Sequence, residues 1–396
     1  MMDSTERKTE PDSEAALYRD RNLQIIFLIT LMAVLGVASI TPVFPKIARE
    51  LHISAQSIGL LVTSFTLPGI FLTPALGVLS DRLGRKKILI PSLFLFALGG
   101  GACSLARDFE ILLLLRFVQG IGAAAIGSLN ATLIGDLYSG KKRMIAMGYN
   151  ASVLSIGTAT YPTIGGMIAL FGWRYPFLLP LLAIPVGLVV LFALKNPEPE
   201  NTEDFFPYLR AAWKSMKNLR VLTYFTANLF TFIILYGAFL TFIPIFINER
   251  FGASPALIGL VMSAMSLVTA ATSSQLGRLI KKFSDRKLLK VSFFLYAAGL
   301  LLIPFVHNLW LMVLPIILFG LAHGANIPII QALIAGEAPM QYRGTFMSLN
   351  GMVLRLGQTL GPLLMGAVFV LWGITGIFYA GAILAAGIAL FLMLML

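Results

Sequence analysis

The sequence predicts an all-α membrane protein in which twelve transmembrane helices form two six-helix halves. Of its 396 residues, 58% are hydrophobic and only 12% are charged, which is too little polar surface to cover a soluble domain of this size. The charges are clustered and leave apolar runs long enough to cross the roughly 30 Å of hydrocarbon in a bilayer. Short sequence features also recur at a constant offset of 200 residues, which indicates an internal duplication.

Twelve apolar runs have the length that a transmembrane helix needs, about 20 residues at a rise of about 1.5 Å each. We expect helices at 22–45, 57–80, 87–106, 110–135, 144–170, 174–194, 222–247, 257–280, 289–307, 309–335, 344–371 and 374–396. The preceding residues mix acidic and basic side chains and lack the basic start and cleavage site of a signal peptide. We therefore expect residues 1–21 to form a cytosolic tail.

The basic residues predict how the protein is oriented, because short cytoplasmic loops collect positive charge. With the amino terminus inside, 23 of the 30 Lys and Arg fall in the tail and the loops of one side. Both termini are therefore expected in the cytoplasm and the protein in the plasma membrane. The formal charge of +12 is spread over many short loops rather than gathered on one face, which argues against nucleic acid as a partner. The single Cys103 excludes an internal disulfide.

The internal duplication divides the chain into two halves. Gly77 matches Gly277, Asn150 matches Asn350 and Pro162 matches Pro362. Two halves of six helices in the same orientation place a pseudo-two-fold axis along the membrane normal. The halves are expected at residues 22–194 and 222–396, joined by a cytosolic linker at 195–221 whose second part, "FFPYLRAAWKSMKNL", has the pattern of an amphipathic helix at the inner leaflet.

The segment "GVLSDRLGRKK", residues 77–87, lies at the cytoplasmic end of the second predicted helix. Gly77 would let another helix approach closely, and Gly84 would allow a turn. Asp81 can pair with neighbouring basic side chains, and such pairs can hold one conformation and break in another. The segment resembles the loop signature of the major facilitator superfamily, and the positions that would form this conformational switch are Gly77, Asp81, Arg82, Gly84, Arg85 and Lys86.

A simpler alternative is that the basic residues of this loop only orient the protein in the membrane. Asp81 argues against it, because an orientation anchor has no use for an acidic residue. The duplicated segment "GRLIKKFSDRK", residues 277–287, has Lys281 where the first copy has Asp81. We therefore expect only the first loop to act as the switch.

The fourth predicted helix carries an arginine in an apolar segment, "LLLLRFVQGIGAAA". Arg116, Gln119 and Gly120 share one face by their spacing. They resemble the fourth-helix arginine motif of proton-coupled members of the superfamily, which implies a role for Arg116 in proton coupling. Because Arg116 lies about 9 Å from the outer end of its predicted helix, the alternative is a surface anchor whose side chain extends to the interface.

The fifth predicted helix contains "GYNASVLSIGTATYPTIGG", an apolar stretch rich in residues that disfavour helices. In lipid, glycines permit close helix packing and a proline gives a bend. The spacing resembles the antiporter motif of drug/proton antiporters, through Gly148, Gly157, Tyr161, Pro162, Gly165 and Gly166. That motif has Gly-Pro where this chain has Tyr161-Pro162, so the phenol either fills a helix interface or turns its hydroxyl toward a cavity. The alternative is general packing of small residues.

Polar residues in the middle of predicted helices mark a substrate path, since burying them in lipid is costly unless they face a cavity or a partner. The candidates for the cavity are Asn130, Asn150, Asn228, Tyr236, Asn326, Asn350, Arg355 and Gln358.

No acidic residue is expected at mid-membrane depth, because all 18 fall in the tail, the loops or the helix ends. The resemblance associates cation-exporting multidrug antiporters with such a carboxylate. His323 is the remaining proton carrier at mid-depth, with Asp136 near the inner end of the fourth helix as another candidate. The alternative for His323 is a purely structural hydrogen bond.

The resemblance covers nearly the whole chain and implies a multidrug-type efflux transporter of the drug/proton antiporter family. Such a protein exports small amphiphilic compounds by alternating access in exchange for protons. The buried Arg116, Arg355 and His323 favour neutral, zwitterionic or anionic substrates over a dication. The alternative is an exporter or flippase of a neutral or anionic sugar, peptide or lipid-linked metabolite.

Other functional classes lack their residues in this sequence. It carries no nucleophile with a base, no phosphate loop and no metal-ligand spacing, so we expect neither an enzyme nor a bound cofactor or metal. The expected partners are the small-molecule substrate, protons and the lipid bilayer, with the protein working as a monomer.

Overall fold

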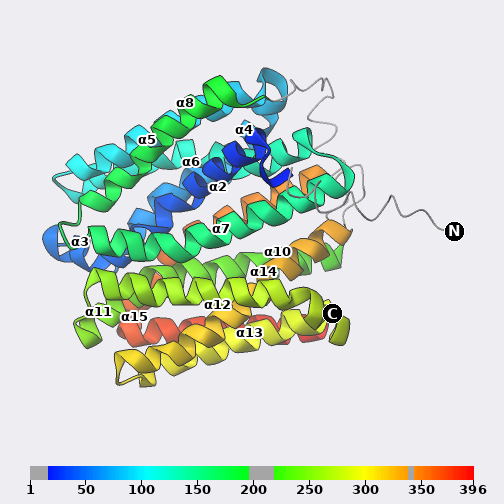
Figure 1. The fold of residues 1–396 in the computed structure, drawn as a ribbon. Helices are drawn as coiled ribbons and strands as arrows, with labels where there is room; N and C mark the ends of the chain where they lie inside the picture. The colour runs from blue at the N-terminus through cyan, green and yellow to red at the C-terminus, as the bar shows by residue number, and fades with distance from the viewer. Residues whose placement is uncertain (1–16, 196–217, 338–342) are drawn as a thin grey trace.

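The computed structural model describes residues 17–195, 218–337 and 343–396, which are mostly helical (Figure 1). Within these ranges, ten helices are long and apolar enough to cross a membrane. The prediction of a multi-pass helical membrane protein is therefore confirmed. The expected tail and the expected amphipathic helix of the linker fall almost wholly outside the described residues.

Each predicted span coincides with a helix or a chain of short helical segments. The first group comprises α2 (Arg21–Ala38) and α3 (Phe44–Glu50), α4 (Leu60–Leu83), α5 (Arg85–Ala102), α6 (Phe109–Leu137), α7 (Gly140–Ile168) and α8 (Ala183–Ala193). The second comprises α10 (Leu219–Ile233) and α11 (Ile243–Phe251), which a π-helix (Ile234–Phe242) joins, then α12 (Pro255–Lys282), α13 (Asp285–Leu302), α14 (Val313–Glu337) and α15 (Arg343–Met395).

The last helix, α15, contains one backbone break. Gly373 has φ 67° and ψ −172°, a conformation that glycine adopts readily and other residues do not. This break separates two long helical stretches within α15. It lies between the two spans that the sequence predicts at 344–371 and 374–396, so this predicted boundary is confirmed.

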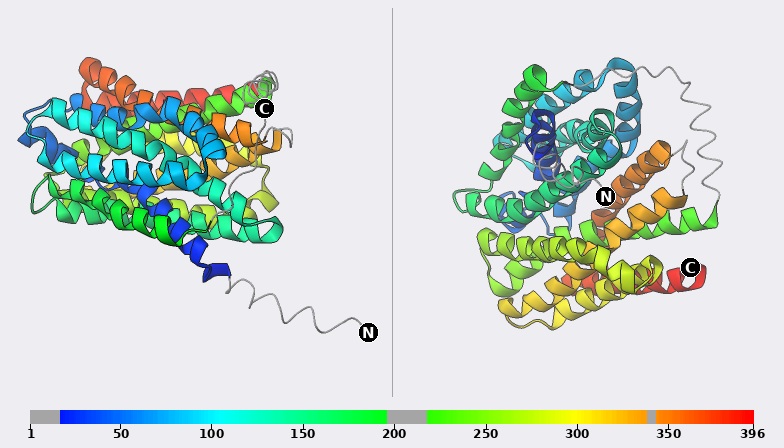
Figure 2. Two further views of the ribbon diagram at one scale, coloured as in Figure 1. Left: turned by 90° about the horizontal axis from the view of Figure 1, so that it is seen from above. Right: turned by 45° about the vertical axis from the view of Figure 1, so that its right-hand side comes forward.

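The helices form two groups that lie side by side. Figure 1 shows α2 to α8 in one group and α10 to α15 in the other, and the right-hand view of Figure 2 keeps them on separate sides. Two helix pairs make the main contacts between the groups, α7 with α12 and α4 with α15. Any passage between the groups is therefore bounded by these four helices.

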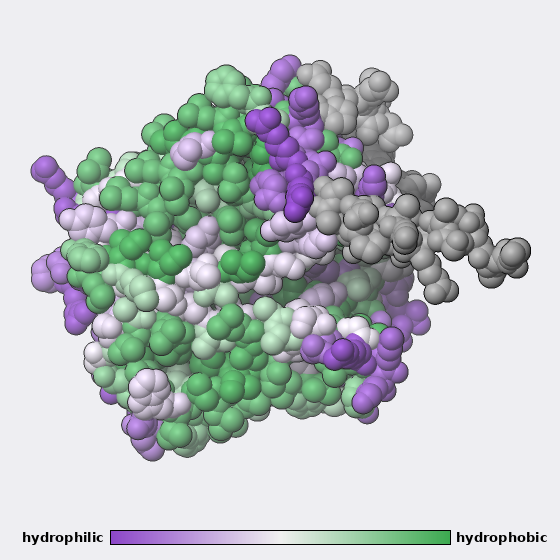
Figure 3. Space-filling model, in the orientation of Figure 1, coloured by the Kyte–Doolittle hydropathy of each residue, from purple (hydrophilic) through white to green (hydrophobic). Residues whose placement is uncertain are grey.

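The surface separates apolar and charged regions as a membrane protein requires. Hydrophobic side chains cover the middle of the face in Figure 3, and hydrophilic ones gather toward the two ends. We name the ends by their charge. The basic end carries Arg82, Lys87, Lys142, Lys282 and Lys287, and the opposite end carries Lys46, Arg174 and Arg250.

The two groups meet at the opposite end, and several glycines toward the basic end lack described neighbours. One buried apolar cluster includes Phe44 and Trp173 of the first group together with Phe242 and Phe246 of the second. Toward the basic end, one glycine in each helix of the two contacting pairs has no described neighbour within 4 Å of the position that a Cβ would occupy. These four open glycines are Gly77 of α4, Gly148 of α7, Gly277 of α12 and Gly351 of α15. The described residues thus show a packed contact between the groups at the opposite end.

Candidate functional site

The closed end is built from glycines that face prolines across the two groups. Gly259 of α12 packs so closely on the Pro162 carbonyl of α7 that a Cβ there would overlap it. In the other pair, a Cβ on Gly59 would lie 3.0 Å from Pro362 Cβ of α15. Gly59 and Gly259, like Pro162 and Pro362, are 200 residues apart in sequence. Both contacts therefore use duplicated positions.

Hydroxyl groups add polar contacts to the same two helix pairs. Thr163 of α7 and Ser263 of α12 share a hydrogen bond of 2.7 Å between their Oγ atoms. The Thr66 and Thr359 hydroxyls, from α4 and α15, are 2.9 Å apart. These bonds lie close to the proline contacts in sequence, and they fix the register of each pair.

The antiporter-like motif of α7 divides into a packed part and an open part. Gly165 lies against the Ser39 carbonyl and Gly166 against the Pro255 carbonyl, without room for a side chain at either. Gly157 packs on Val34 of α2, whereas Gly148 has open space beside it. The motif thus joins α7 both to its own group and to α12.

Tyr161 occupies the position at which the chain departs from the motif. Its half-buried ring packs with the apolar core of the first group. Its hydroxyl makes no hydrogen bond to another described residue, so packing is the contribution that the structure assigns to this side chain. The ring thus packs at a helix interface, and a role for the hydroxyl stays a prediction.

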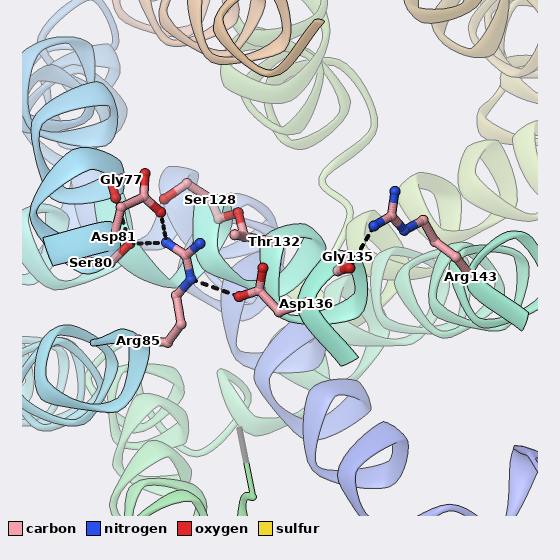
Figure 4. Close-up of polar contacts among 9 residues, drawn as sticks. All are labelled: Gly77, Ser80, Asp81, Arg85, Ser128, Thr132, Gly135, Asp136 and Arg143. Carbon is pink, nitrogen blue, oxygen red and sulfur yellow. Dashed lines mark hydrogen bonds and ion pairs between the residues drawn. The ribbon is translucent and has the colours of Figure 1, made fainter. Parts of the chain in front are cut away.

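An ion-pair cluster at the basic end has Arg85 at its centre (Figure 4). The Arg85 side chain is only 7% exposed and forms ion pairs with Asp81 of α4 and with Asp136 of α6, the latter at 2.8 Å from Nε to Oδ2. It also donates to the Ser80 hydroxyl at 2.7 Å. Gly84, with φ 98°, makes the turn that brings Arg85 back toward α4. Three helices are joined here.

Other residues of the expected switch have different surroundings. Lys86 donates to the backbone carbonyls of Leu191 and Leu194 beside α8, at 2.9 and 3.0 Å. Arg82 is exposed. No described residue outside its own helix backbone lies within 4 Å of the position that a Cβ of Gly77 would occupy, so the described helices do not make the close approach expected at Gly77.

Arg116 lies inside the first group and does not reach the membrane surface. It is 2% exposed, and its guanidinium lies 4.2 Å from the centre of the Phe65 ring. Its Nη1 donates to the Gly36 carbonyl at 2.9 Å and to Gln119 Oε1 at 2.7 Å. The surface-anchor alternative is therefore wrong, because protein oxygens take the place of water around this charge.

In the first group, mid-membrane amides meet at a threonine. Asn130 of α6 donates to the Thr30 hydroxyl of α2 at 2.9 Å, and Asn150 Oδ1 of α7 lies 2.5 Å from the same hydroxyl. Both asparagines are half-buried. The sequence did not single out Thr30 as a site residue, because it looks like the other threonines in the helices.

In the second group, three asparagines are buried and do not line a cavity. Asn228 donates to Asn350 at 2.7 Å, and Asn326 accepts from Thr231 at 2.9 Å and donates to Ser292 at 3.0 Å. None is more than 3% exposed. The cavity assignment of Asn228, Asn326 and Asn350 is therefore wrong, because their amides are used to join α10 to α15 and, through Thr231 and Asn326, to α14 and α13.

His323 of α14 has a tyrosine partner that sequence reasoning missed. Its Nδ1 lies 2.7 Å from the Tyr296 hydroxyl of α13. Tyr296 is fully buried, and its ring also packs on Phe319. In the sequence it reads as an ordinary aromatic residue of an apolar helix.

Arg355 of α15 extends from the second group to the first. Its Nη1 donates to Gln358 Oε1 at 3.0 Å. A Cβ on Gly69 of α4 would lie 3.1 Å from Arg355 Cδ, and one on Gly127 of α6 would lie 2.8 Å from Nη2. Arg355 is half-buried, and Gly127 is exposed beside it.

Both ion pairs between described residues involve Arg85. Arg355 therefore has no carboxylate partner among these residues. The described residues also contain no group of three His, Cys, Asp or Glu side chains that could hold a metal ion. The site can therefore bind a ligand through hydrogen bonds and charge.

Comparison with known proteins agrees with this architecture. The chain is 27% identical to Multidrug resistance protein 1 of Bacillus subtilis (strain 168) over 378 residues, which cover 93% of this chain and 96% of that one. It is 24% identical to the quinolone resistance protein NorA of Staphylococcus aureus (strain COL), over 88% of this chain and 90% of that one. Its fold matches the crystal structure of the nucleoside transporter NupG with a TM-score of 0.77 at 14% identity, over 95% and 99% of the two chains.

The match to a family model extends over almost the whole chain. The model described as Major Facilitator Superfamily matches residues 26–253 and 236–396. Those ranges include both helix groups, the Arg85 cluster and the Pro162 and Pro362 contacts. The protein therefore belongs to the major facilitator superfamily of membrane transporters.

Proposed function

We propose that the protein is a secondary active exporter of small amphiphilic compounds that works by alternating access in exchange for protons. In this proposal it has twelve transmembrane helices, in halves at 22–194 and 222–396 that a pseudo-two-fold axis relates. A cytosolic linker at 195–221 joins them. The protein works as a monomer in the plasma membrane, with the basic end and both termini in the cytoplasm.

The observation that carries the proposal is the packing of the two groups at the opposite end, from which we infer that the basic end is open. The groups share an apolar core at the opposite end, whereas the four open glycines toward the basic end have no described neighbour where a side chain would lie. A substrate could enter from the basic end in this state. Reversing the closure would bring α4 toward α15 and α7 toward α12 at the basic end, and glycines allow backbones to approach that closely.

The paired glycine and proline contacts support the symmetry in this proposal. Gly59 contacts Pro362, and Gly259 contacts Pro162. Each glycine and each proline has its duplicate 200 residues away in the other contact, so the internal duplication relates the two contacts. A rocking motion about them would leave both intact while the basic end closes. Asp81, Arg85 and Asp136 would then act as the switch, because their ion pairs join α4, α5 and α6 in the open state.

The proton would be carried by His323, with Asp136 as the second candidate. His323 is half-buried and shares a hydrogen bond with the Tyr296 hydroxyl. An imidazole can gain or lose a proton near neutral pH. Export is supported by the names of the relatives, which are multidrug and quinolone resistance proteins.

Accumulation measurements test this function. Cells that express the protein are loaded with a panel of cationic, neutral and anionic amphiphilic dyes, with and without a protonophore. We expect lower accumulation of at least one dye, restored by the protonophore, and weaker export from the His323→Ala variant. Unchanged accumulation across the panel would overturn the export proposal, and export that persists with the protonophore would overturn proton exchange. Export that persists unchanged in His323→Ala would remove His323 from the mechanism.

A further inference from the structure

We propose that Arg355 binds the carboxylate of an amphiphilic substrate. This inference rests on the proposed export function and names the class of compound that the site takes: a small molecule with one carboxylate and an aromatic or apolar body. It follows from the hydrogen bonding, the position and the neighbours of this one side chain.

Arg355 uses fewer of its donors on described residues than the two other arginines that lie within the helix groups. A guanidinium carries five N–H donors. Arg116 uses its donors on two backbone carbonyls and on Gln119, and Arg85 uses its own on Asp81, Asp136 and Ser80. The one hydrogen bond of Arg355 to a described residue goes to Gln358.

An unpaired cation between the groups favours an anion that arrives from outside the protein. Removing a charge from water is costly unless an opposite charge or hydrogen-bond acceptors replace the water. No carboxylate of the described residues lies within ion-pair distance of Arg355. A bidentate pair with a substrate carboxylate matches the planar shape of the guanidinium.

The position of Arg355 lets a molecule reach it from the open end. The side chain is half-buried rather than enclosed, and Gly127 beside its Nη2 is exposed. On α15 itself, Gly351 lies one turn nearer the basic end and has open space beside it. A carboxylate that entered at the basic end would therefore meet Arg355 between the two groups.

The neighbours of Arg355 suit the rest of such a molecule. Tyr236 lies on the π-helix that packs against α15, and its ring lies 6.2 Å from that of Phe232. A half-buried tyrosine beside a phenylalanine offers an apolar surface with one polar atom. Gly69 and Gly127 keep side chains out of the space that the guanidinium occupies.

Binding of two matched fluorescent probes tests the site. Dansyl-glycine carries a carboxylate, and dansyl-glycinamide has the same body without the charge. Fluorescence titration uses the purified full chain in detergent. We expect the wild-type protein to bind the acid about tenfold tighter than the amide, since charge-assisted hydrogen bonds form with the acid alone. Arg355→Gln should remove this difference, and Arg355→Lys should retain part of it.

A second variant keeps the arginine in case Arg355→Gln does not fold. Gly127→Ala places a methyl group against Nη2 and should weaken binding of the acid at least threefold while leaving the amide unaffected. Gly387→Ala is the control, because Gly387 is exposed on α15 with open space beside it. Equal wild-type affinity for the two probes, or an equal loss for both in Arg355→Gln, would overturn the proposal.

Transport of the probes separates this inference from the proposed function. The protein is reconstituted in vesicles with an imposed pH gradient, and the movement of both dyes is followed. Transport of the amide without the acid overturns the carboxylate site and leaves export standing. Selective binding of the acid without any transport supports the site and counts against export.

Discussion

Arg85 of α5 and Asp136 of α6 form an ion pair, with 2.8 Å between Nε and Oδ2, that joins neighbouring helices at the basic end. The same guanidinium pairs with Asp81 of α4. One largely buried cation therefore neutralises two acidic side chains from two other helices. Its removal would leave two carboxylates facing each other.

The Arg85 cluster predicts a stability cost when one acidic partner is neutralised. In Asp136→Asn, Arg85 keeps Asp81 but loses a charge-assisted hydrogen bond in a site that is only partly exposed. We expect the free energy of unfolding to fall by roughly 1–3 kcal/mol. The thermal midpoint in detergent measures this loss. Arg82→Ala, an exposed change in the same loop, should leave the midpoint nearly unchanged, and an equal loss in both variants would contradict the assignment.

The close contact of α12 with α7 predicts a penalty for the smallest added side chain. A Cβ at Gly259 would overlap the Pro162 carbonyl, so Gly259→Ala must push the two groups apart at the closed end. We expect a loss of about 1–3 kcal/mol in the free energy of unfolding. Gly277→Ala lies on the same helix with open space beside it and should cost far less. Comparable thermal midpoints for the two variants would rule out the contact.

The open glycines predict one-sided chemical access. After Cys103→Ala removes the single cysteine, Gly148→Cys should react with a membrane-impermeant maleimide added from the basic side. Gly166→Cys, at the closed contact with α12, should react much more slowly from either side. Labelling in vesicles of known orientation measures both rates. Faster labelling of Gly148→Cys from the opposite side would contradict both the orientation and the open end.

The Tyr296 and His323 pair predicts a loss of transport without loss of the fold. Tyr296→Phe keeps the buried ring and removes the hydroxyl that meets His323 Nδ1 at 2.7 Å. We expect export to slow by about two- to tenfold, because the imidazole loses the partner that fixes its orientation. The thermal midpoint should change little. Tyr379→Phe is the control, since Tyr379 is exposed on α15, and equal export by the two variants would remove the pair from the mechanism.

The fold was largely predictable, because a transmembrane span depends on a local run of apolar residues. The break between the last two spans is predictable for a similar reason, and Gly373 makes it. The π-helix at Ile234–Phe242 was not predicted. Its apolar residues would suit an α-helix equally, and the geometry depends on packing against α15 rather than on composition.

The sequence predicted individual residues of the candidate site, but it did not predict which of them contact each other. Asp136 and Arg85 were both expected to act, in separate roles, and their contact depends on how α5 meets α6. Asn326 was expected to line a cavity, but it is buried within the second group. Sequence position gives the depth of an amide in the membrane, but only tertiary packing decides whether it faces the space between the groups or the inside of one group.

Most of the polar contacts that the sequence did not predict are made by Ser and Thr hydroxyl groups. Thr30, Thr231 and Ser292 each bond a backbone carbonyl within their own helix, as such residues commonly do in membranes. Nothing in the sequence separates them from the other helical Ser and Thr. Their second role, as partners of Asn130, Asn150 and Asn326, becomes visible only when the helices are placed together.

The four open glycines also indicate how the protein would be inhibited. In the proposed cycle, the backbones beside Gly77, Gly148, Gly277 and Gly351 must come together after the substrate has bound. A compound lodged among them would arrest the cycle in the open state without occupying Arg355. Such an inhibitor would lower the maximal export rate, and a higher concentration of substrate would not relieve it.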